Sequence, residues 1–388
     1  MKTKYNLIRS YLLVAVLLLP AVAQAQFTFT TNNSAIIITG YSGSGVAAIP
    51  NTINGHPVTG INYGAFSFCT GLTGITIPNN VTNIGEQAFY YCTGLTEINV
   101  DAGNPAYSSM KGVLFNYSRT TLVDFPGGLG GSYMIPNSVT NIGVKAFYWC
   151  VNVTNISLPD SVISVGDLAF SDCLDLTSVT IPNSVTSIGV GAFAACRSLK
   201  SILIPNSITN IADIVFESTG LTNLIIPDGV VSIGDSVFSG CSSLNSVTIP
   251  ASVVSIKEFA FESCSNLKNV FFKGNAPAIT AVIFPGDNAA TAYYLPQATG
   301  WGASYGGIPT VLWNAQAQTN NRHIGVQTNQ FSFNITGTTN IPVVVEACTN
   351  LGGAWVPLQS VSLTNGSFYF SDPQWTNYPG RFYRLRSP

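Results

Sequence analysis

Ionisable side chains are scarce in this sequence. Only 8% of its 388 residues are charged, against about 25% in ordinary globular domains, and it has two histidines, His56 and His323. Ser-His-Asp catalysis needs a histidine oriented by an acid, and neither histidine has an identifiable partner. Phosphate loops, dinucleotide fingerprints and the G-x-S-x-G elbow of serine hydrolases are also missing. We therefore expect a protein that is not an enzyme and that needs no cofactor.

Metal-ligand clusters are missing as well. The spacings C-x2-C and H-x3-H, which are typical of zinc sites, do not occur. Carboxylates gather at Asp160, Asp167, Asp172 and Asp175. A calcium site there is an open alternative, although the spacing matches no calcium-binding loop. With a formal net charge of −2 and no basic patch, the chain is not expected to bind nucleic acid.

No apolar stretch is long enough to span a membrane. The longest candidate, Tyr11–Leu19, falls short of the roughly 20 residues that a membrane helix needs. Basic residues precede this run, and an A-x-A cleavage signal, Ala23-Gln24-Ala25, follows it. We therefore expect residues 1–25 to be a signal peptide and the protein to be secreted or held at the cell surface.

What the sequence does have is one repeated pattern: Ile-Pro, a polar pair, Val or Ile, Gly, Ala-Phe, Cys and Leu. Each copy contains two short stretches with strand-like alternation, and the proline ends the first of them. One copy cannot bury its own apolar face, so the fixed period predicts a mainly β solenoid of about eight stacked 23-residue repeats. The phenylalanine column comprises Phe66, Phe89, Phe147, Phe170, Phe193, Phe216, Phe238 and Phe261.

Seven of the eight cysteines share one position of the repeat, three residues after the phenylalanine. Disulfides are an alternative in an exported protein, because stacked repeats place Cα atoms about 5 Å apart. The Cβ atoms would point the same way, however, and Thr219 fills the position in one repeat. We therefore favour a column of small buried side chains. It comprises Cys69, Cys92, Cys150, Cys173, Cys196, Cys241 and Cys264.

Changes in the pattern divide the chain into parts. Terminal repeats are expected to be atypical because they close an open apolar end. The short alternating segments near the C-terminus predict a small β-sandwich-like domain, which could equally pack on the solenoid as a second cap. The expected parts are an N-terminal cap (26–48), the solenoid (49–313) with an island (101–134) and a C-terminal cap (271–313), a linker (314–322) and the small β domain (323–388).

The copy that runs from Ile135-Pro136 through Ala146-Phe147 to Cys150 resembles the repeats of the BspA-like leucine-rich repeat family of secreted and surface proteins. Gly112–Phe115 of the island and the capping pair Gly300-Trp301 are similar to features of that family. The resemblance extends over about residues 27–313. It implies a leucine-rich-repeat solenoid and a role in adhesion or protein binding at the cell surface. It implies no catalytic residue, because the shared motif is structural.

The strand motif Leu-x-x-Val-x-Ile predicts a binding surface. Its Leu, Val and Ile face the core, so the third and fifth positions point outward to one face. Apolar members at Leu203, Ile225 and Phe271 lie among polar ones, as in many protein interfaces. The predicted face consists of Glu97, Asn99, Asn155, Ser157, Ser178, Thr180, Ser201, Leu203, Asn223, Ile225, Ser246, Thr248, Asn269 and Phe271.

These features predict a secreted, non-catalytic binding protein, adhesin-like or matrix-binding. Its ligand would be a protein or a glycan at the cell surface or in the extracellular matrix. A self-assembling structural component of the cell envelope or matrix is the main alternative. A carbohydrate-active enzyme is a third alternative, but no pair of carboxylates lines up along the repeats as such a site requires.

Overall fold

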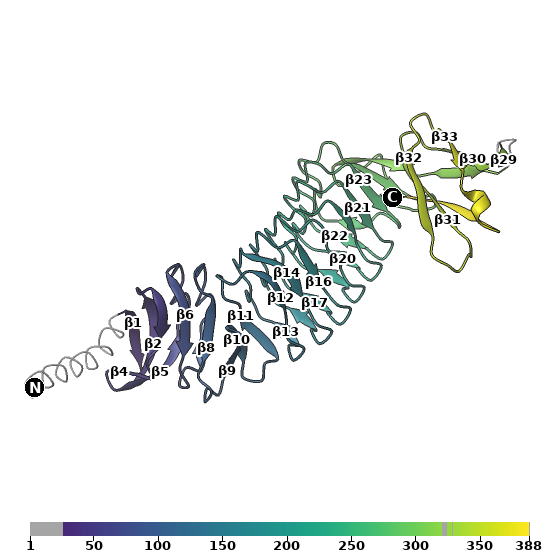
Figure 1. Ribbon diagram of the computed structural model, residues 1–388. Helices are drawn as coiled ribbons and strands as arrows, with labels where there is room; N and C mark the ends of the chain where they lie inside the picture. Colours follow the sequence, from purple (N-terminus) through teal and green to yellow (C-terminus); the bar gives the residue numbers. More distant parts are fainter. Residues whose placement is uncertain (1–25, 320–323, 328, 388) are drawn as a thin grey trace, which may run out of the picture. The chain divides into compact units, whose positions relative to one another are not determined.

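The computed structural model describes residues 26–319, 324–327 and 329–387 (Figure 1). Nearly all regular structure in this part of the chain is strand, and its one helix is a short 3-10 turn, Trp375–Asn377. No helix among these residues is long and apolar enough to cross a bilayer. The expected signal peptide, residues 1–25, and His323 lie outside the described residues.

Contacts divide the chain into two compact units. The first contains residues up to Leu221 together with Ile233–Ser242, and the second contains Thr222–Ser232 and the residues from Ser243 onward. Each unit contains part of the solenoid, and the second also contains the C-terminal domain.

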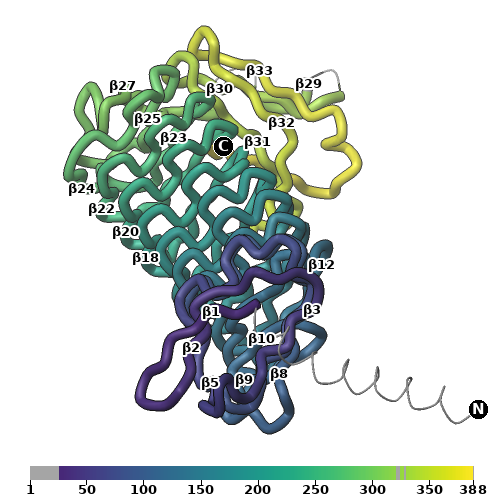
Figure 2. The backbone as a smooth tube through the Cα atoms, turned by 90° about the vertical axis from the view of Figure 1, so that its left-hand side faces the viewer, coloured from purple at the N-terminus to yellow at the C-terminus, as the bar shows by residue number. Residues whose placement is uncertain are grey.

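Within each unit the backbone winds in successive coils (Figure 2), as predicted for a solenoid. Most coils add a strand to a first row, although Ser201–Ile204 form none; within each sheet of this row neighbours pair in parallel and in step with the repeat, and Asn155, for example, lies opposite Ser178. In the first unit the row consists of two three-stranded sheets, one of β3 (Gly45–Ala48), β6 (Leu72–Ile77) and β8 (Glu97–Val100), the other of β12 (Gly131–Met134), β14 (Val153–Ser157) and β16 (Ser178–Thr180). In the second unit it contains β19 (Asn223–Ile225), β21 (Ser246–Ile249), β23 (Asn269–Phe272), β25 (Thr291–Tyr294) and β27 (Ile308–Leu312).

The Val-x-x-Ile-Gly segments form a second row of mostly two-residue strands. The glycine that follows is needed for close approach of the coils: a Cβ atom added to Gly166 would lie 2.7 Å from the backbone nitrogen of Val144. The row contains β5 (His56–Ile61), β7 (Asn83–Ile84), β11 (Thr121–Asp124), β13 (Asn141–Ile142), β15 (Ser164–Val165), β17 (Ser187–Ile188), β18 (Asn210–Ile211), β20 (Ser232–Ile233), β22 (Ser255–Ile256) and β24 (Ala278–Ile279).

Phenylalanine rings stack along the core of the first unit, which confirms the predicted column. Consecutive ring centroids are 4.6 to 5.8 Å apart along the series Phe125, Phe147, Phe170, Phe193, Phe216 and Phe238. Such offset stacking adds about 0.5–1.5 kcal/mol per pair to the hydrophobic gain. Phe125 is an unexpected member of this column, since it belongs to the island that interrupts the repeat.

The seven cysteines of the column are free thiols, which contradicts the disulfide alternative; Cys69 is half-buried and the other six are buried. Thiols of the column also make hydrogen bonds across the stack: Cys173 Sγ donates to the carbonyl oxygen of Phe147 at 3.1 Å. Thr219 fills the same position and donates its hydroxyl to the carbonyl of Phe216 at 2.9 Å. The position therefore selects a small side chain that can donate a hydrogen bond.

The N-terminal segment forms an antiparallel hairpin of β1 (Phe27–Asn32) and β2 (Ala35–Tyr41) at the position of the expected cap. Its Phe27 and Tyr41 rings lie 6.2 and 5.4 Å from the ring of Phe66, so they cover the first ring of the column. A short strand, β4 (Thr52–Ile53), pairs with the start of β5.

The island contributes a hairpin and one further coil. β9 (Tyr107–Met110) and β10 (Val113–Asn116) pair antiparallel, and β11 and β12 then pair in parallel with the next coil. The buried Asn104 holds the entry to the hairpin, since its amide donates to the carbonyls of Pro78 and Val81 at 2.8 Å each. The stack therefore continues through the island, as expected.

The coils of the second unit continue beyond Val270, where the sequence pattern fades. β25 and β27 pair in parallel after β23, and the ring of Phe284 stacks on that of Phe261 at 5.2 Å. The segment expected as a C-terminal cap, 271–313, therefore contains further coils. It ends with the hairpin of β26 (Ser304–Tyr305) and β27.

The C-terminal domain consists of two small antiparallel sheets, as expected for a β-sandwich-like domain. The expected linker, 314–322, is not merely a connection, because β28 (Ala315–Gln318) within it pairs with β30 (Gln330–Gly337). Tyr293, Leu295 and Val311 of the last coils pack against the core of this domain, which therefore also covers the solenoid. One sheet contains β28 (Ala315–Gln318), β29 (Gly325–Gln327), β30 (Gln330–Gly337) and β33 (Ser367–Asp372); the other contains β31 (Pro342–Cys348), β32 (Val356–Ser362) and β34 (Phe382–Arg386).

Candidate functional site

The first candidate surface is the outward side of the first row of strands, here called the sheet face. In the first unit the register places Met134 opposite Ser157 and Ser157 opposite Thr180. Leu203 holds the same repeat position one copy further on. Met134 and Leu203 are each 79% exposed, so two aliphatic side chains project from a mainly polar face.

Most residues of the predicted face do point outward. In the second unit Ser246 Oγ donates to Asn223 Oδ1 at 2.7 Å, so polar side chains bond from one coil to the next. The exposed members are Glu97, Asn99, Asn155, Ser178, Thr180, Ser201, Leu203, Asn223 and Ile225; the half-buried members are Ser157, Ser246 and Asn269.

Two members of the predicted face are buried, and for these the prediction is wrong. Phe271 is 3% exposed and Thr248 is 7% exposed, although the register places both in the same column as Ile225. The ring of Phe271 stacks on that of Tyr293 at 5.2 Å, and Tyr293 packs against the C-terminal domain. The end of the sheet face is therefore occupied by the protein's own domain.

The second candidate surface is a group of five aromatic residues, here called the aromatic ridge: Phe68, Tyr90, Tyr91, Tyr148 and Trp149. Ring centroids are 5.2 Å apart for the pairs Phe68–Tyr90, Tyr90–Tyr148 and Tyr91–Trp149. Phe68 is 63% exposed and the other four rings are half-buried. The ridge is thus a continuous aromatic surface built from three turns.

The aromatic ridge was not predicted from the sequence, although the repeat contains a signal for it. The ridge residues stand one and two positions after a core phenylalanine. The second of these positions is aromatic in the early copies of the repeat, as Phe68, Tyr91 and Trp149. In the later copies the same position is occupied by Asp172, Ala195, Ser218, Gly240 and Ser263. Comparing this column across the repeats would have revealed the change from aromatic to small side chains.

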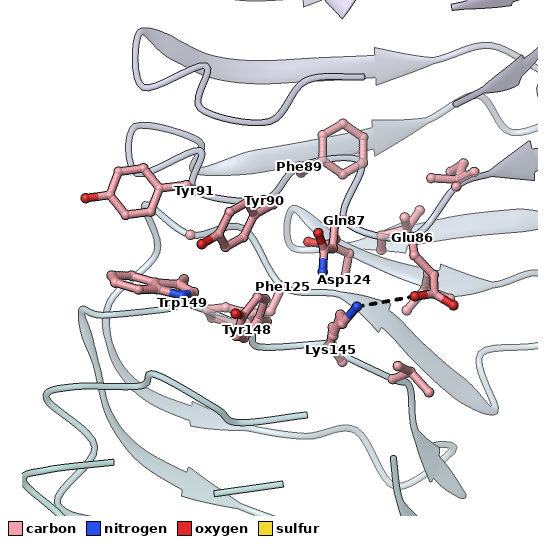
Figure 3. Close-up of a pocket in the computed structure, with 17 residues that line it drawn as sticks. Glu86, Gln87, Phe89, Tyr90, Tyr91, Asp124, Phe125, Lys145, Tyr148 and Trp149 are labelled. Carbon is pink, nitrogen blue, oxygen red and sulfur yellow. Dashed lines mark hydrogen bonds and ion pairs between the residues drawn. The ribbon is translucent and has the colours of Figure 1, made fainter. Parts of the chain in front are cut away.

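A cleft of about 120 Å³ adjoins the ridge (Figure 3). Tyr90 and Tyr148 form one wall of the cleft. At the other side lies the ion pair between Lys145 Nζ and Glu86 Oε2, which are 3.4 Å apart. Gln87 and Asp124 lie between the rings and the ion pair.

The polar groups of the cleft are incompletely satisfied. Gln87 Oε1 accepts a hydrogen bond from the Tyr63 hydroxyl at 2.6 Å, whereas no hydrogen bond or ion pair engages the Asp124 carboxylate in the described part of the chain. Burial raises the pKa of Asp124 well above its usual value. The cleft thus offers an amide and a carboxyl group beside aromatic rings.

No candidate metal centre is found among the residues that the structure describes. His56 begins β5 in a hairpin with β4, as expected of a turn residue. No group of three or more His, Cys, Asp or Glu side chains within the described ranges could hold a metal ion. Asp167 instead accepts a hydrogen bond from the backbone nitrogen of Val190 at 2.8 Å, and Asp172 accepts one from the Ser171 hydroxyl at 2.9 Å.

Solved structures of similar proteins include a leucine-rich repeat protein from Bacteroides ovatus, with 24% identity over 70% of this chain and 83% of that one and a TM-score of 0.41. A leucine-rich cell surface protein from Faecalibacterium prausnitzii has 25% identity over 64% of this chain and 94% of that one, with a TM-score of 0.26. The pneumococcal vaccine antigen PcpA has 21% identity over 65% of this chain and 63% of that one, with a TM-score of 0.44. No curated protein matches the sequence.

A family model described as the BspA type leucine-rich repeat region, in six copies, matches residues 26–130, 131–244 and 209–299. These are the residues that form the coils, their stacked phenylalanines and their buried thiols. Because the matched ranges together run from residue 26 to residue 299, well over half of the chain, the protein belongs to the BspA-type leucine-rich repeat family.

Proposed function

We propose that this chain is an exported, non-catalytic binding protein whose sheet face holds a protein partner outside the cell. The observation that carries the proposal is the exposure of Leu203, 79% on a face whose neighbours are mostly Ser, Thr and Asn. Apolar side chains surrounded by polar ones are typical of the centres of protein interfaces. Met134, equally exposed on the same column, supplies a second contact of the same kind.

Export is proposed from the N-terminal sequence, where a basic start, an apolar core and Ala23-Gln24-Ala25 precede the first strand. The absence of chemistry is proposed from the scarcity of histidine and from the scattered carboxylates. Sequencing the N-terminus of protein recovered from the culture medium or cell surface should find it near Gln26. A retained Met1 would contradict the export proposal.

The test of the binding face is the substitution Leu203→Asp in the full chain. Because a charge would be desolvated at the centre of the interface, we expect at least a tenfold loss of partner capture from an extract of the native surroundings. Ile163→Asp is the matched control, since Ile163 is an exposed aliphatic residue, 51% accessible, outside the first row of strands. Both variants should unfold at the temperature of the unmodified protein.

Equal capture by Leu203→Asp and the unmodified chain would exclude this face as the binding site. Sedimentation of the purified chain examines the alternative of self-assembly. If the chain associates with itself and Leu203→Asp abolishes that association, the occupant of the face is a second copy, and the proposal of a foreign partner fails.

A further inference from the structure

We infer that the aromatic ridge and its cleft form a separate binding site for a neutral saccharide. The site lies on the turns that follow the core phenylalanines, and it uses no residue of the sheet face. The inference therefore does not depend on the proposed function, and either can fail without the other.

The fold itself does not require these aromatic rings. Later turns adopt the same backbone with small residues: φ is +60° at Trp149, +58° at Ala195, +55° at Ser218 and +69° at Gly240. Positive φ is unfavourable for bulky side chains, so a turn of this shape is better served by glycine or a small polar residue. Three aromatic residues at this position are therefore a departure that the solenoid does not explain.

The island brings the rings together. Between the turns that carry Tyr90 and Tyr148, the island places Pro126 and Gly127 after its own core ring, Phe125. Gly127 lines the cleft and has no side chain to separate the rings on either side. Tyr90 and Tyr148 consequently stack at 5.2 Å with an interplanar angle of 14°, although they belong to different copies of the repeat.

The shape of the site excludes some ligands. Quaternary ammonium groups are bound in cages of rings that surround a cation, but the stacked rings of Tyr90 and Tyr148 leave no space between them. A volume of about 120 Å³ is also below the 300–1,000 Å³ usual for sites that enclose a whole small molecule. The cleft thus suits one small unit of a larger ligand, with the exposed ring of Phe68 and the half-buried rings beside it as a platform for the neighbouring units.

The chemistry of the site favours a sugar over an apolar side chain. The electron-rich face of an aromatic ring attracts the C–H bonds on the apolar face of a sugar ring. The hydroxyl groups at the sugar's edge need both donors and acceptors, which the Gln87 amide and the Asp124 carboxyl group supply. An apolar side chain would bury the Asp124 carboxyl group without a partner, which is unfavourable.

The charge of the site favours a neutral ligand. Lys145 is engaged by Glu86, so no cation in the cleft is left to attract an acidic sugar. Burial raises the pKa of Asp124, which increases the share of its neutral form, and that form both donates and accepts hydrogen bonds.

The test is an array of immobilised neutral and acidic oligosaccharides probed with the full chain, followed by calorimetric titration with the neutral oligosaccharide that binds best. We expect Trp149→Ala to weaken its binding at least tenfold and Trp149→Phe, which keeps a ring, to restore most of it. Tyr117→Ala is the matched control, because Tyr117 is 64% exposed but lies on the island hairpin outside the ridge. That control should bind as the unmodified chain does.

A further variant protects the test against misfolding. If Trp149→Ala proves unstable, Asp124→Ala leaves every ring in place and should still weaken binding several-fold, since it removes the hydrogen-bonding group of this residue from the cleft. Absence of binding to every oligosaccharide, binding to acidic ones alone, or unchanged affinity in both Trp149→Ala and Asp124→Ala would overturn the inference. Loss of protein-partner capture in Leu203→Asp with intact saccharide binding would leave it standing.

Discussion

Asp287 should make the second unit less stable as the pH rises, and the shift in the pKa of its carboxyl group determines the size of this effect. It stands three residues after Phe284, at the position that cysteine occupies in other coils. The residue is 2% exposed, and neither carboxylate oxygen has a hydrogen-bond partner among the described residues. Burial, and then the nearby carboxylate of Glu262, raise the pKa of Asp287 from 3.8 to about 7; the backbone of Cys264, although it makes no hydrogen bond of normal geometry to the carboxylate, lowers the pKa in part.

The direction of the pH effect on stability follows from the two pKa values of Asp287, 3.8 in the unfolded chain and about 7 in the folded one. Well below pH 4 the carboxyl group is protonated in both the folded and the unfolded chain, so its ionisation does not change the free energy of unfolding. As the pH rises to 7, the unfolded chain releases the proton more readily than the folded one, and the free energy of unfolding falls. The full loss above pH 7 is about 4 kcal/mol, of which roughly 2–3 kcal/mol is lost between pH 5 and pH 8.

Asp287→Asn should remove this dependence because the amide does not ionise. We expect urea denaturation of the full chain at pH 5 and pH 8 to show that the variant loses roughly 2–3 kcal/mol less than the unmodified protein. Asp228→Asn, at an exposed acid of the same unit, should change nothing. Losses that agree within about 0.5 kcal/mol for Asp287→Asn and the unmodified chain would refute the reasoning.

Two further predictions concern the core. Phe193 is fully buried between Phe170 and Phe216, at 5.1 and 5.8 Å, so Phe193→Ala should lower the free energy of unfolding by roughly 3–5 kcal/mol in urea denaturation; a loss under about 1 kcal/mol would contradict a core position. All eight cysteines should react with a thiol reagent after denaturation and most of them slowly before it, since burial raises the pKa of Cys196 to about 12. A shortfall of two or more thiols in denatured protein would point to a disulfide.

The solenoid could be predicted from the sequence because stacking gives each core position the same surroundings in every coil. Phe193 and Cys196 recur at a fixed spacing for that reason, and the structure confirms their burial. Phe125 and Phe284 were not predicted as members of the phenylalanine column, because each is followed by Pro-Gly. The other copies have at these positions the residues that lead to the cysteine. A core position can thus persist after its neighbours in the motif have changed.

The surfaces were less predictable than the core. Strand alternation places Phe271 in the same column as Ile225, but its ring is buried against Tyr293, which packs against the C-terminal domain, and alternation contains no information about such contacts. The aromatic ridge depends on Tyr90 and Tyr148, which meet only because the island between them presents Gly127. The proposed binding roles of both surfaces remain predictions.

The closure of the coil stack by dedicated end segments has a consequence for how such a chain can change in length. At one end Phe27 and Tyr41 cover the first core ring, and at the other the C-terminal domain packs on the last coils. Duplication or deletion of an internal copy of the repeat would leave both end segments intact and would join turns of the same kind. The number of repeats can therefore change during evolution, by gain or loss of the gene segment that encodes one copy, without exposing the apolar core at either end.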